Sequence, residues 1–246
     1  MVAYVWRRSG GDDSALYRYV RAPDGRTFAR EPDHPLFASH NARPEIRRQC
    51  GDGRISNDAF DVLHNPGGTW EYYAAHVEKA TDPRAVIRHD NAPGLLRFIG
   101  RSTSNDGVHW SPVDVVLRPD YGAGDSYDTQ FYGMQVFRYR GFYLGLLHTF
   151  HAQSQTIQPE WAWSHNGQNW ARTRTPCIPL GDEGAFDSRM ILFGSVLLTD
   201  DQVVWLYSGY DWRHNGFRNG EVGSSIGRAT IRRAELDAWV DTLPQP

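Results

Sequence analysis

The sequence predicts an all-β protein, a β-propeller of four to five four-stranded blades around a central pocket. Three observations carry this prediction: a succession of short segments rich in β-branched and aromatic residues, a recurring Asp-Gly or Asn-Gly turn, and Asp-led strand pairs between these turns. Aromatic residues make up 13% of the chain and include 9 Trp. This content suits packed sheets whose faces are filled by large rings.

The predicted strands are bounded by Gly, Pro, Asn or Asp, as strands usually are. They cover residues 3–8, 15–21, 59–64, 69–77, 95–102, 113–118, 133–140, 141–150, 160–164, 190–199 and 202–210. Only residues 234–243 (AELDAWVDTL) have a helical pattern. The chain is therefore expected to contain many short strands and few helices.

The turn motif recurs in segments 21–30, 102–112 and 163–172, each with an aromatic residue three positions after the glycine. Asp-Gly and Asn-Gly supply the positive φ angles of a type I′ hairpin turn. The aromatic ring then covers the sheet just beyond the turn. A unit that recurs in this way predicts a repeat architecture.

A second element precedes each complete turn: an Asp, an apolar strand, a turn with Gly or Asp, and an aromatic strand. These elements start at Asp58, Asp128 and Asp187. Together the two elements form a four-stranded unit, which is a propeller blade. The blades are expected at about 54–120, 125–181 and 184–245, with an incomplete blade at 1–50 that begins at its second strand, all in a single domain of residues 1–246.

The incomplete blade predicts an unpaired strand edge at residues 1–8, which natural proteins normally cover. Two ways of covering it are open. One is a homodimer or larger assembly that contacts residues 1–8. The other is closure by the C-terminal tail, residues 234–246.

The starting ends of the inner strands of a propeller converge at one mouth, so Asp58, Asp128 and Asp187 are the candidate catalytic residues. Clustered carboxylates raise one another's pKa, so that one can donate a proton while another stays ionised. That division is the requirement for glycoside hydrolysis. The alternative is structural, because an Asp at a strand start often caps the preceding turn.

Further residues are expected around the mouth as substrate-binding groups. Aromatic rings there suit the apolar faces of sugars, and an arginine can bind a carboxylate, a phosphate or a hydroxyl. A metal is not expected, because the i, i+3 spacing of two of the histidines places them on opposite faces of a strand. No cofactor is expected either. The predicted binding set is Gln130, Tyr132, His148, His151, Glu160, Arg189, Trp212 and His214.

The repeated turns and the segment DAFDVLHNPGGTWEYYAA (58–75) resemble the five-bladed propeller glycoside hydrolases of families 43, 32 and 68, which include arabinanases, xylosidases, invertases and levansucrases. The resemblance implies three acidic residues from successive inner strands. Asp58 matches the residue that tunes the acid's pKa, and Asp128 lies near the general acid, although Gln130 and Phe131 sit closer to the aligned position. Asp187 is the equivalent in the next blade. The family's first-blade Asp has no counterpart here.

Two classes of function therefore stay open. The first is a glycosidase that cleaves a small sugar or glycoside by carboxylate acid–base catalysis. The second is a non-hydrolytic propeller that binds a carbohydrate or performs a biosynthetic acid–base reaction of the cyclase or lyase type. They differ in whether a third carboxylate, Asp187 or Glu160, comes within reach of Asp58 and Asp128.

Composition limits the partners. The chain has 26 basic and 29 acidic residues and no dense Lys/Arg run, so nucleic acid is not an expected partner. No stretch is long and apolar enough to cross a membrane, and the N-terminus lacks the apolar core of a signal peptide. A cytoplasmic protein with a small carbohydrate substrate is expected.

Overall fold

The computed structural model describes residues 1–8, 14–38, 54–85, 95–216 and 223–244. The all-β class is confirmed, since these ranges consist mainly of antiparallel strands. Within them the one α-helix is α2 (Arg233–Asp241), at the position that the sequence predicts. Two short 3-10 helices, η2 (Pro83–Ala85) and η3 (Tyr121–Ala123), lie in connecting loops.

The strands form successive up-and-down sheets. The first contains β1 (Val2–Arg8), β2 (Ser14–Arg21), β3 (Phe28–Arg30) and β4 (Phe37–Ala38), with both β3 and β4 paired to β2. The second runs in chain order through β5 (Arg54–His64), β6 (Trp70–Lys79), β7 (Leu95–Ser104) and β8 (Asp114–Leu117).

The third sheet consists of two up-and-down units. One contains β9 (Thr129–Tyr139), β10 (Phe142–His151), β11 (Thr156–Ser164) and β12 (Ala171–Pro176). The other contains β13 (Met190–Leu198), β14 (Gln202–Tyr210) and β15 (Ser225–Arg232). A single parallel pair, Ile157 with Met190, joins them.

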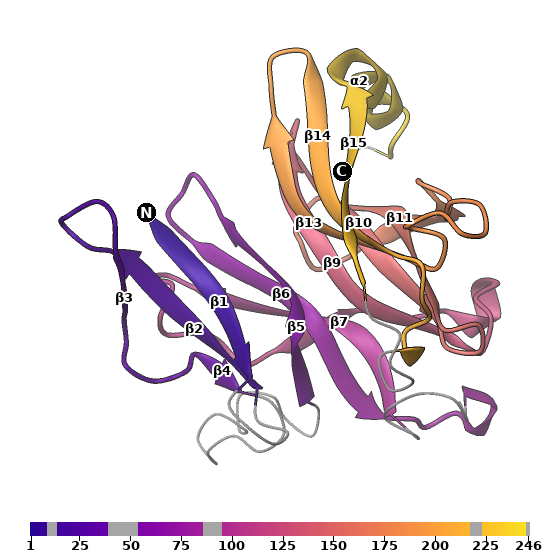
Figure 1. The fold of residues 1–246 in the computed structure, drawn as a ribbon, viewed down its shortest axis with the longest axis horizontal. Helices are drawn as coiled ribbons and strands as arrows, with labels where there is room; N and C mark the ends of the chain where they lie inside the picture. The colour runs from indigo at the N-terminus through magenta and orange to yellow at the C-terminus, as the bar shows by residue number, and fades with distance from the viewer. Residues whose placement is uncertain (9–13, 39–53, 86–94, 217–222, 245–246) are drawn as a thin grey trace.

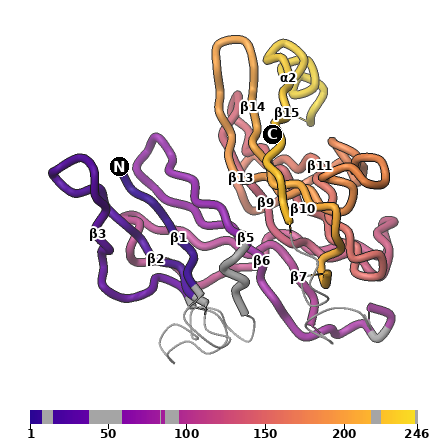
Figure 2. The backbone as a smooth tube through the Cα atoms, in the orientation of Figure 1, coloured from indigo at the N-terminus to yellow at the C-terminus, as the bar shows by residue number. Residues whose placement is uncertain are grey.

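The sheets follow one another around the molecule in chain order. Figure 1 shows the N-terminal sheet on one side, strands β13–β15 on the other, and β5–β7 between them, and the tube in Figure 2 follows the same course. Strands β5 and β9 contact each other, as do β9 and β13. The described strands do not close into a ring.

The three glycine turns differ from the predicted type I′ geometry. Only the glycines have positive φ, 68° at Gly25, 73° at Gly107 and 71° at Gly167, whereas type I′ requires positive φ at both central residues. The preceding Asp or Asn side chain explains the difference. The Asp106 carboxylate accepts hydrogen bonds from the N–H groups two and three residues later, and Asn166 does the same. The type I′ prediction is wrong because these side chains form Asx turns.

Helix α2 packs on the third sheet through aromatic side chains. Helix α2 contributes Trp239, whose ring centroid lies 5.1 Å from that of Trp161 and 6.0 Å from that of Trp163. The helix therefore packs on the third sheet and does not cover the free edge of β1. Among the described residues β1 pairs only with β2. Closure of this edge by the C-terminal tail is not observed, and self-association remains a prediction.

Candidate functional site

A cavity of about 180 Å³ lies where the first strands of three successive units meet. We call it the axial cavity. It is lined from β5, β9, β10 and β13, and its lining includes Asp61, Tyr132, Gln135, His148, Phe193 and Gly194. Two residues of the predicted binding set, Tyr132 and His148, are thus brought together.

Asp61 places a carboxyl group in the axial cavity. Its oxygens accept hydrogen bonds from the backbone N–H of Val62 (2.9 Å) and from that of Val136 on β9 (2.6 Å). Burial raises the pKa of Asp61 to about 6, although these two donors act in the opposite direction. A carboxyl with this pKa can hold a proton in weakly acidic solution and act as a general acid.

A bulge in β5 positions Asp61. The β5–β6 register passes from the pair Ser56–Ala75 directly to Phe60–Ala74, so residues 57–59 have no partner on β6. A bulge redirects the side chains of the strand that carries it, and bulges are common next to active sites.

His148 lies on β10 and is only 5% exposed. Its Nε2 accepts a hydrogen bond from the Phe193 N–H at 3.0 Å, so the imidazole hydrogen is assigned to Nδ1. Nδ1 is buried and has no hydrogen-bond partner among the described residues. Burial lowers the pKa of His148 to about 4, so the ring is neutral at pH 7. The axial cavity therefore contains a neutral, unsatisfied N–H donor.

Gly133 leaves room beside this donor. A Cβ at position 133 would lie 3.3 Å from His148 Nδ1 and 3.1 Å from the Cβ of Ala59. The absence of a side chain at Gly133 thus keeps the space between β5 and the imidazole open.

Tyr132 belongs to a polar and aromatic cluster beside the axial cavity. Its hydroxyl lies 3.0 Å from Nε2 of His214, and the Arg97 guanidinium lies over its ring at 5.4 Å. Gln130 is fully buried and accepts hydrogen bonds from the backbone N–H and Nη1 of Arg97. Gln130 therefore positions Arg97 and does not itself reach the cavity.

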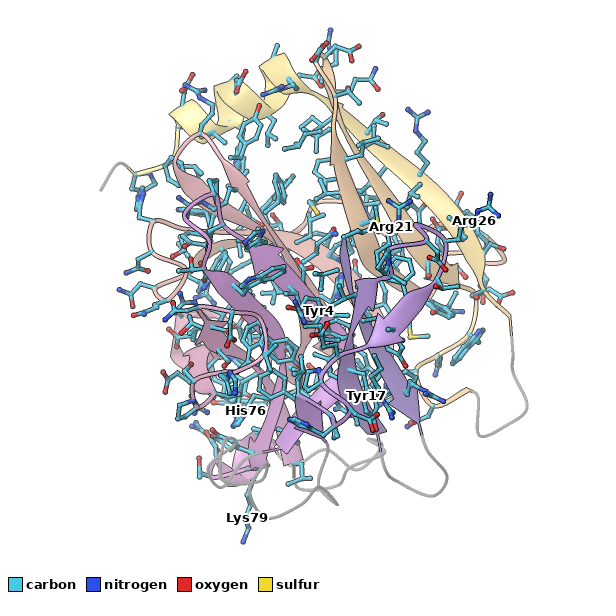
Figure 3. The ribbon with its side chains drawn as sticks, turned by 90° about the vertical axis from the view of Figure 1, so that its left-hand side faces the viewer. Tyr4, Tyr17, Arg21, Arg26, His76 and Lys79 are labelled. Carbon is cyan, nitrogen blue, oxygen red and sulfur yellow. The ribbon has the colours of Figure 1, made fainter. Side chains whose placement is uncertain are left out.

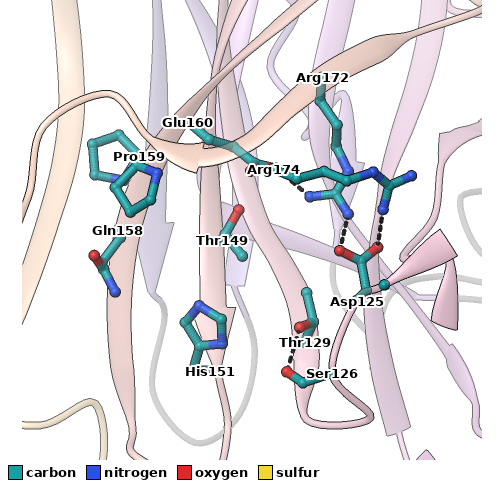
Figure 4. A pocket seen from close by; sticks show the side chains of 12 residues that line it. Asp125, Ser126, Thr129, Thr149, His151, Gln158, Pro159, Glu160, Arg172 and Arg174 are labelled. Atoms are coloured by element: carbon teal, nitrogen blue, oxygen red, sulfur yellow. Dashed lines mark hydrogen bonds and ion pairs between the residues drawn. The ribbon is translucent and has the colours of Figure 1, made fainter.

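A second cavity, of about 200 Å³, lies at the ends of β9–β12 and contains two further predicted residues, His151 and Glu160 (Figure 4). We call it the rim cavity. Arg172 forms ion pairs with Asp125 and Glu160, and Arg174 Nη1 lies 3.1 Å from an Asp125 oxygen. Burial raises the pKa of Glu160, and the charge of Arg172 opposes this rise. The two arginines and two acids leave this cavity close to charge balance.

The three predicted catalytic aspartates are not seen to converge. Asp58 lies on β5, but its side chain is outside the described residues. Asp128 accepts hydrogen bonds from the Ser126 hydroxyl and from the Gln153 N–H, and so caps the turn after β10. Asp187 accepts one from the Tyr207 hydroxyl at 2.9 Å. Neither Asp128 nor Asp187 lines the axial or the rim cavity.

Two other predicted binding residues have local partners. Arg189 forms an ion pair with the exposed Glu183 at 3.0 Å. The Trp212 indole N–H donates to the Gly223 carbonyl. Asp61 was missed in the sequence, although one signal was present: it is the single charged residue in the apolar run 59–63 (AFDVL).

Among the residues that the structure describes, no group of three or more His, Cys, Asp or Glu side chains is arranged to hold a metal ion. Nor does any helix in the described ranges have the length and apolar character needed to span a membrane.

Comparison with known proteins finds solved structures of similar fold. A structure described as a glycoside hydrolase matches with a TM-score of 0.57 at 14% identity over 88% of this chain and 56% of its own. An N-acetylgalactosamine deacetylase from F. plautii, in complex with blood group B trisaccharide, matches with a TM-score of 0.57 at 13% identity over 94% of this chain and 68% of its own. A glycoside hydrolase of the GH130 family of mannoside phosphorylases gives 0.55 at 16% identity, over 85% and 56%.

The fold of this chain is similar to that of these glycoside hydrolase and deacetylase structures. The chain spans little more than half the length of the first two structures matched, 56% in each case. Identities this low show the fold alone. No family model matches the chain, and no curated protein matches it.

Proposed function

We propose that the protein is a glycosidase-like enzyme that acts on a small sugar or glycoside in the axial cavity, with Asp61 as the proton donor. The observation that carries this is the position of Asp61: its carboxyl group lines the cavity and has a pKa raised to about 6. The sheets are taken as blades of a propeller with four to five blades. The likeness to families 43, 32 and 68 and a cytoplasmic location are part of the same proposal.

The cavity suits one sugar ring. An engineered cavity of about 150 Å³ holds benzene, and the axial cavity, at about 180 Å³, is slightly larger. His148 Nδ1–H would donate to a sugar hydroxyl, which would satisfy its unpartnered hydrogen. The Tyr132 ring supplies an apolar wall. Protonated Asp61 would then give its proton to the leaving oxygen as the glycosidic bond breaks.

Hydrolysis needs a second carboxylate to activate water or attack the sugar. Asp58 is the proposed partner, because it lies three residues before Asp61 on the same bulged strand. The set Asp58, Asp128 and Asp187 is the competing assignment. The capping bonds of Asp128 and the Tyr207 bond of Asp187 favour Asp61 over these two.

A non-hydrolytic function is the second candidate, either carbohydrate binding or a cyclase- or lyase-type reaction. One observation favours it: among the described residues that line the axial cavity, Asp61 is the only carboxylate. A single acid can serve binding or proton transfer without a nucleophile.

Turnover of a panel of nitrophenyl glycosides by matched Asp→Asn variants tests these assignments. We expect Asp61→Asn to lower kcat/KM by about 10²–10⁴-fold, the usual contribution of a general acid. Asp128→Asn should retain activity, because its carboxylate only caps a turn. Full activity of Asp61→Asn together with loss in Asp128→Asn or Asp187→Asn would establish the competing set. Sugar binding that Asp61→Asn weakens, without turnover in the wild type, would establish the second candidate.

A further inference from the structure

A third and larger cavity, of about 530 Å³, lies further along β9 and β10, two of the strands that line the axial cavity. We call it the distal cavity. It is lined by the β5–β6 turn, the end of β7 and the β9–β10 hairpin. On β9 the axial cavity reaches Gln135 and the distal cavity includes Arg138, three residues on, which is about 10 Å along a strand. The two cavities therefore occupy different levels of the fold.

Glu71 lines the distal cavity, and several hydrogen bonds hold its side chain in place. Its carboxylate accepts hydrogen bonds from Asn65 (2.6 Å), Arg101 (2.7 Å), Tyr143 (2.7 Å) and Tyr73 (2.8 Å). Burial by itself would raise the pKa of Glu71, but these donors hold it below its ordinary value. Glu71 is therefore ionised at neutral pH, and the buried ion pair with Arg101 balances its charge.

Arg138 carries the remaining positive charge of the lining. Its guanidinium lies over the Tyr143 ring, 3.9 Å from the centroid, and Tyr143 is itself held by Glu71. No ion pair of Arg138 is found among the described residues, and the side chain is half-buried. The neighbouring polar groups of the cavity, such as Thr69, Thr103 and Asn105, are neutral.

We infer that the distal cavity binds a small ligand through an oxyanion group, a phosphate or a carboxylate, at Arg138. A guanidinium held over an aromatic ring loses little further entropy on binding and presents paired N–H donors that match an oxyanion. The uncompensated charge favours an anion, and the neutral hydroxyl and amide groups suit the polar body of a small molecule. This site is separate from Asp61 and does not depend on the proposed function.

Calorimetric titration of the intact protein at constant ionic strength tests the inference, with inorganic phosphate and glucuronate as separate probes. We expect saturable binding of at least one probe, at one site per chain. Arg138→Gln should weaken it by about tenfold or more, the loss of one charge-assisted pair. The matched control is Arg228→Gln, which removes the same charge from an exposed position on β15 and should bind as the wild type does.

A second variant covers the case in which Arg138→Gln unfolds. Asn105→Asp adds a negative charge to the exposed part of the lining without touching Tyr143, and it should also weaken binding. Preference for phosphate would assign a phosphorylated ligand, and preference for glucuronate an acidic sugar or other carboxylate. The inference would be overturned if neither probe bound saturably, or if the wild type and a folded Arg138→Gln bound the probes equally well.

Discussion

The Tyr4 hydroxyl on β1 donates a hydrogen bond to the Gly107 carbonyl at 3.1 Å, across 103 residues of sequence. Tyr4 is labelled in Figure 3. A Cβ at position 107 would lie 2.6 Å from this hydroxyl oxygen, and Gly107 has φ of +73°. The glycine of the turn motif thus serves both the turn and the contact between the first and second sheets.

This contact predicts a stability effect for Tyr4→Phe. Removal of the hydroxyl leaves the Gly107 carbonyl without this donor, so we expect the free energy of unfolding to fall by about 1 kcal/mol. Urea denaturation measures it. Tyr17→Phe is the control, because the Tyr17 ring contacts Arg30 but no hydrogen bond of its hydroxyl is found among the described residues. An equal loss in both variants would contradict a specific role for Tyr4.

The fold was more predictable than the site. Most strand positions and the Asx-Gly turns follow from local composition, but it does not predict the strands β3, β4, β12 and β15. The site depends on the bulge at residues 57–59, where the β5–β6 register shifts. Alternation along a regular strand does not show this shift, so the sequence points to Asp58, the first residue of the motif, and gives little reason to prefer Asp61.

For Asp128 and Asp187 the sequence leaves the choice between a catalytic and a structural role open. A carboxylate that caps a turn and one that protonates a sugar occupy the same place at the start of a strand. The difference lies in their partners, the Gln153 N–H and the Tyr207 hydroxyl, which are distant or ambiguous in sequence. Only the three-dimensional arrangement reveals them.

The buried His148 predicts an acid-dependent loss of stability. Its pKa is about 4 in the folded chain, against 6.5 for a free histidine. Between these values the unfolded chain binds a proton that the folded chain does not, so stability falls as pH drops from about 6.5 to about 4. In an Asp61→Asn background, which removes the opposing titration of Asp61, urea midpoints at pH 7, 6 and 5 should therefore decrease. His148→Gln, which keeps an acceptor for the Phe193 N–H, should reduce this decrease.

Asp61 acts in the opposite direction. Its folded pKa of about 6 exceeds the ordinary value of 3.8, so the folded chain binds the extra proton between these values and gains stability as pH falls from about 6 to about 4. Asp61→Asn removes that gain, and its urea midpoint should fall more steeply with acidification than that of the wild type. A parallel pH dependence in the two proteins would mean that Asp61 has an ordinary pKa in the folded state.

The same titration predicts a pH–rate profile. If Asp61 is the general acid, kcat/KM should decline as pH rises above about 6, because the proton that it donates is lost. The residual activity of Asp61→Asn should not show this decline of kcat/KM above about pH 6. Rates are to be measured on the best nitrophenyl glycoside from pH 4.5 to pH 8 with folded protein at each pH. A wild-type rate that keeps rising to pH 8 would exclude Asp61 as the acid.

Gly133 provides a steric test of the axial cavity. In Gly133→Ala the added methyl group would lie 3.3 Å from His148 Nδ1, in the space where a ligand hydroxyl would accept its hydrogen. Gly194→Ala is the matched control, because it adds a methyl group to the same cavity lining with its nearest contact at 4.0 Å, the Leu206 carbonyl oxygen. Loss of one hydrogen bond and of space for the ring should lower kcat/KM, or sugar affinity, by about tenfold or more in Gly133→Ala. Gly194→Ala should stay within a few-fold of the wild type.

Since the methyl group added in Gly133→Ala also lies 3.1 Å from the Cβ of Ala59, this variant should lose some stability. The kinetics of both variants should therefore be compared below their unfolding transitions. Unchanged activity in a folded Gly133→Ala would show that the substrate does not enter beside His148.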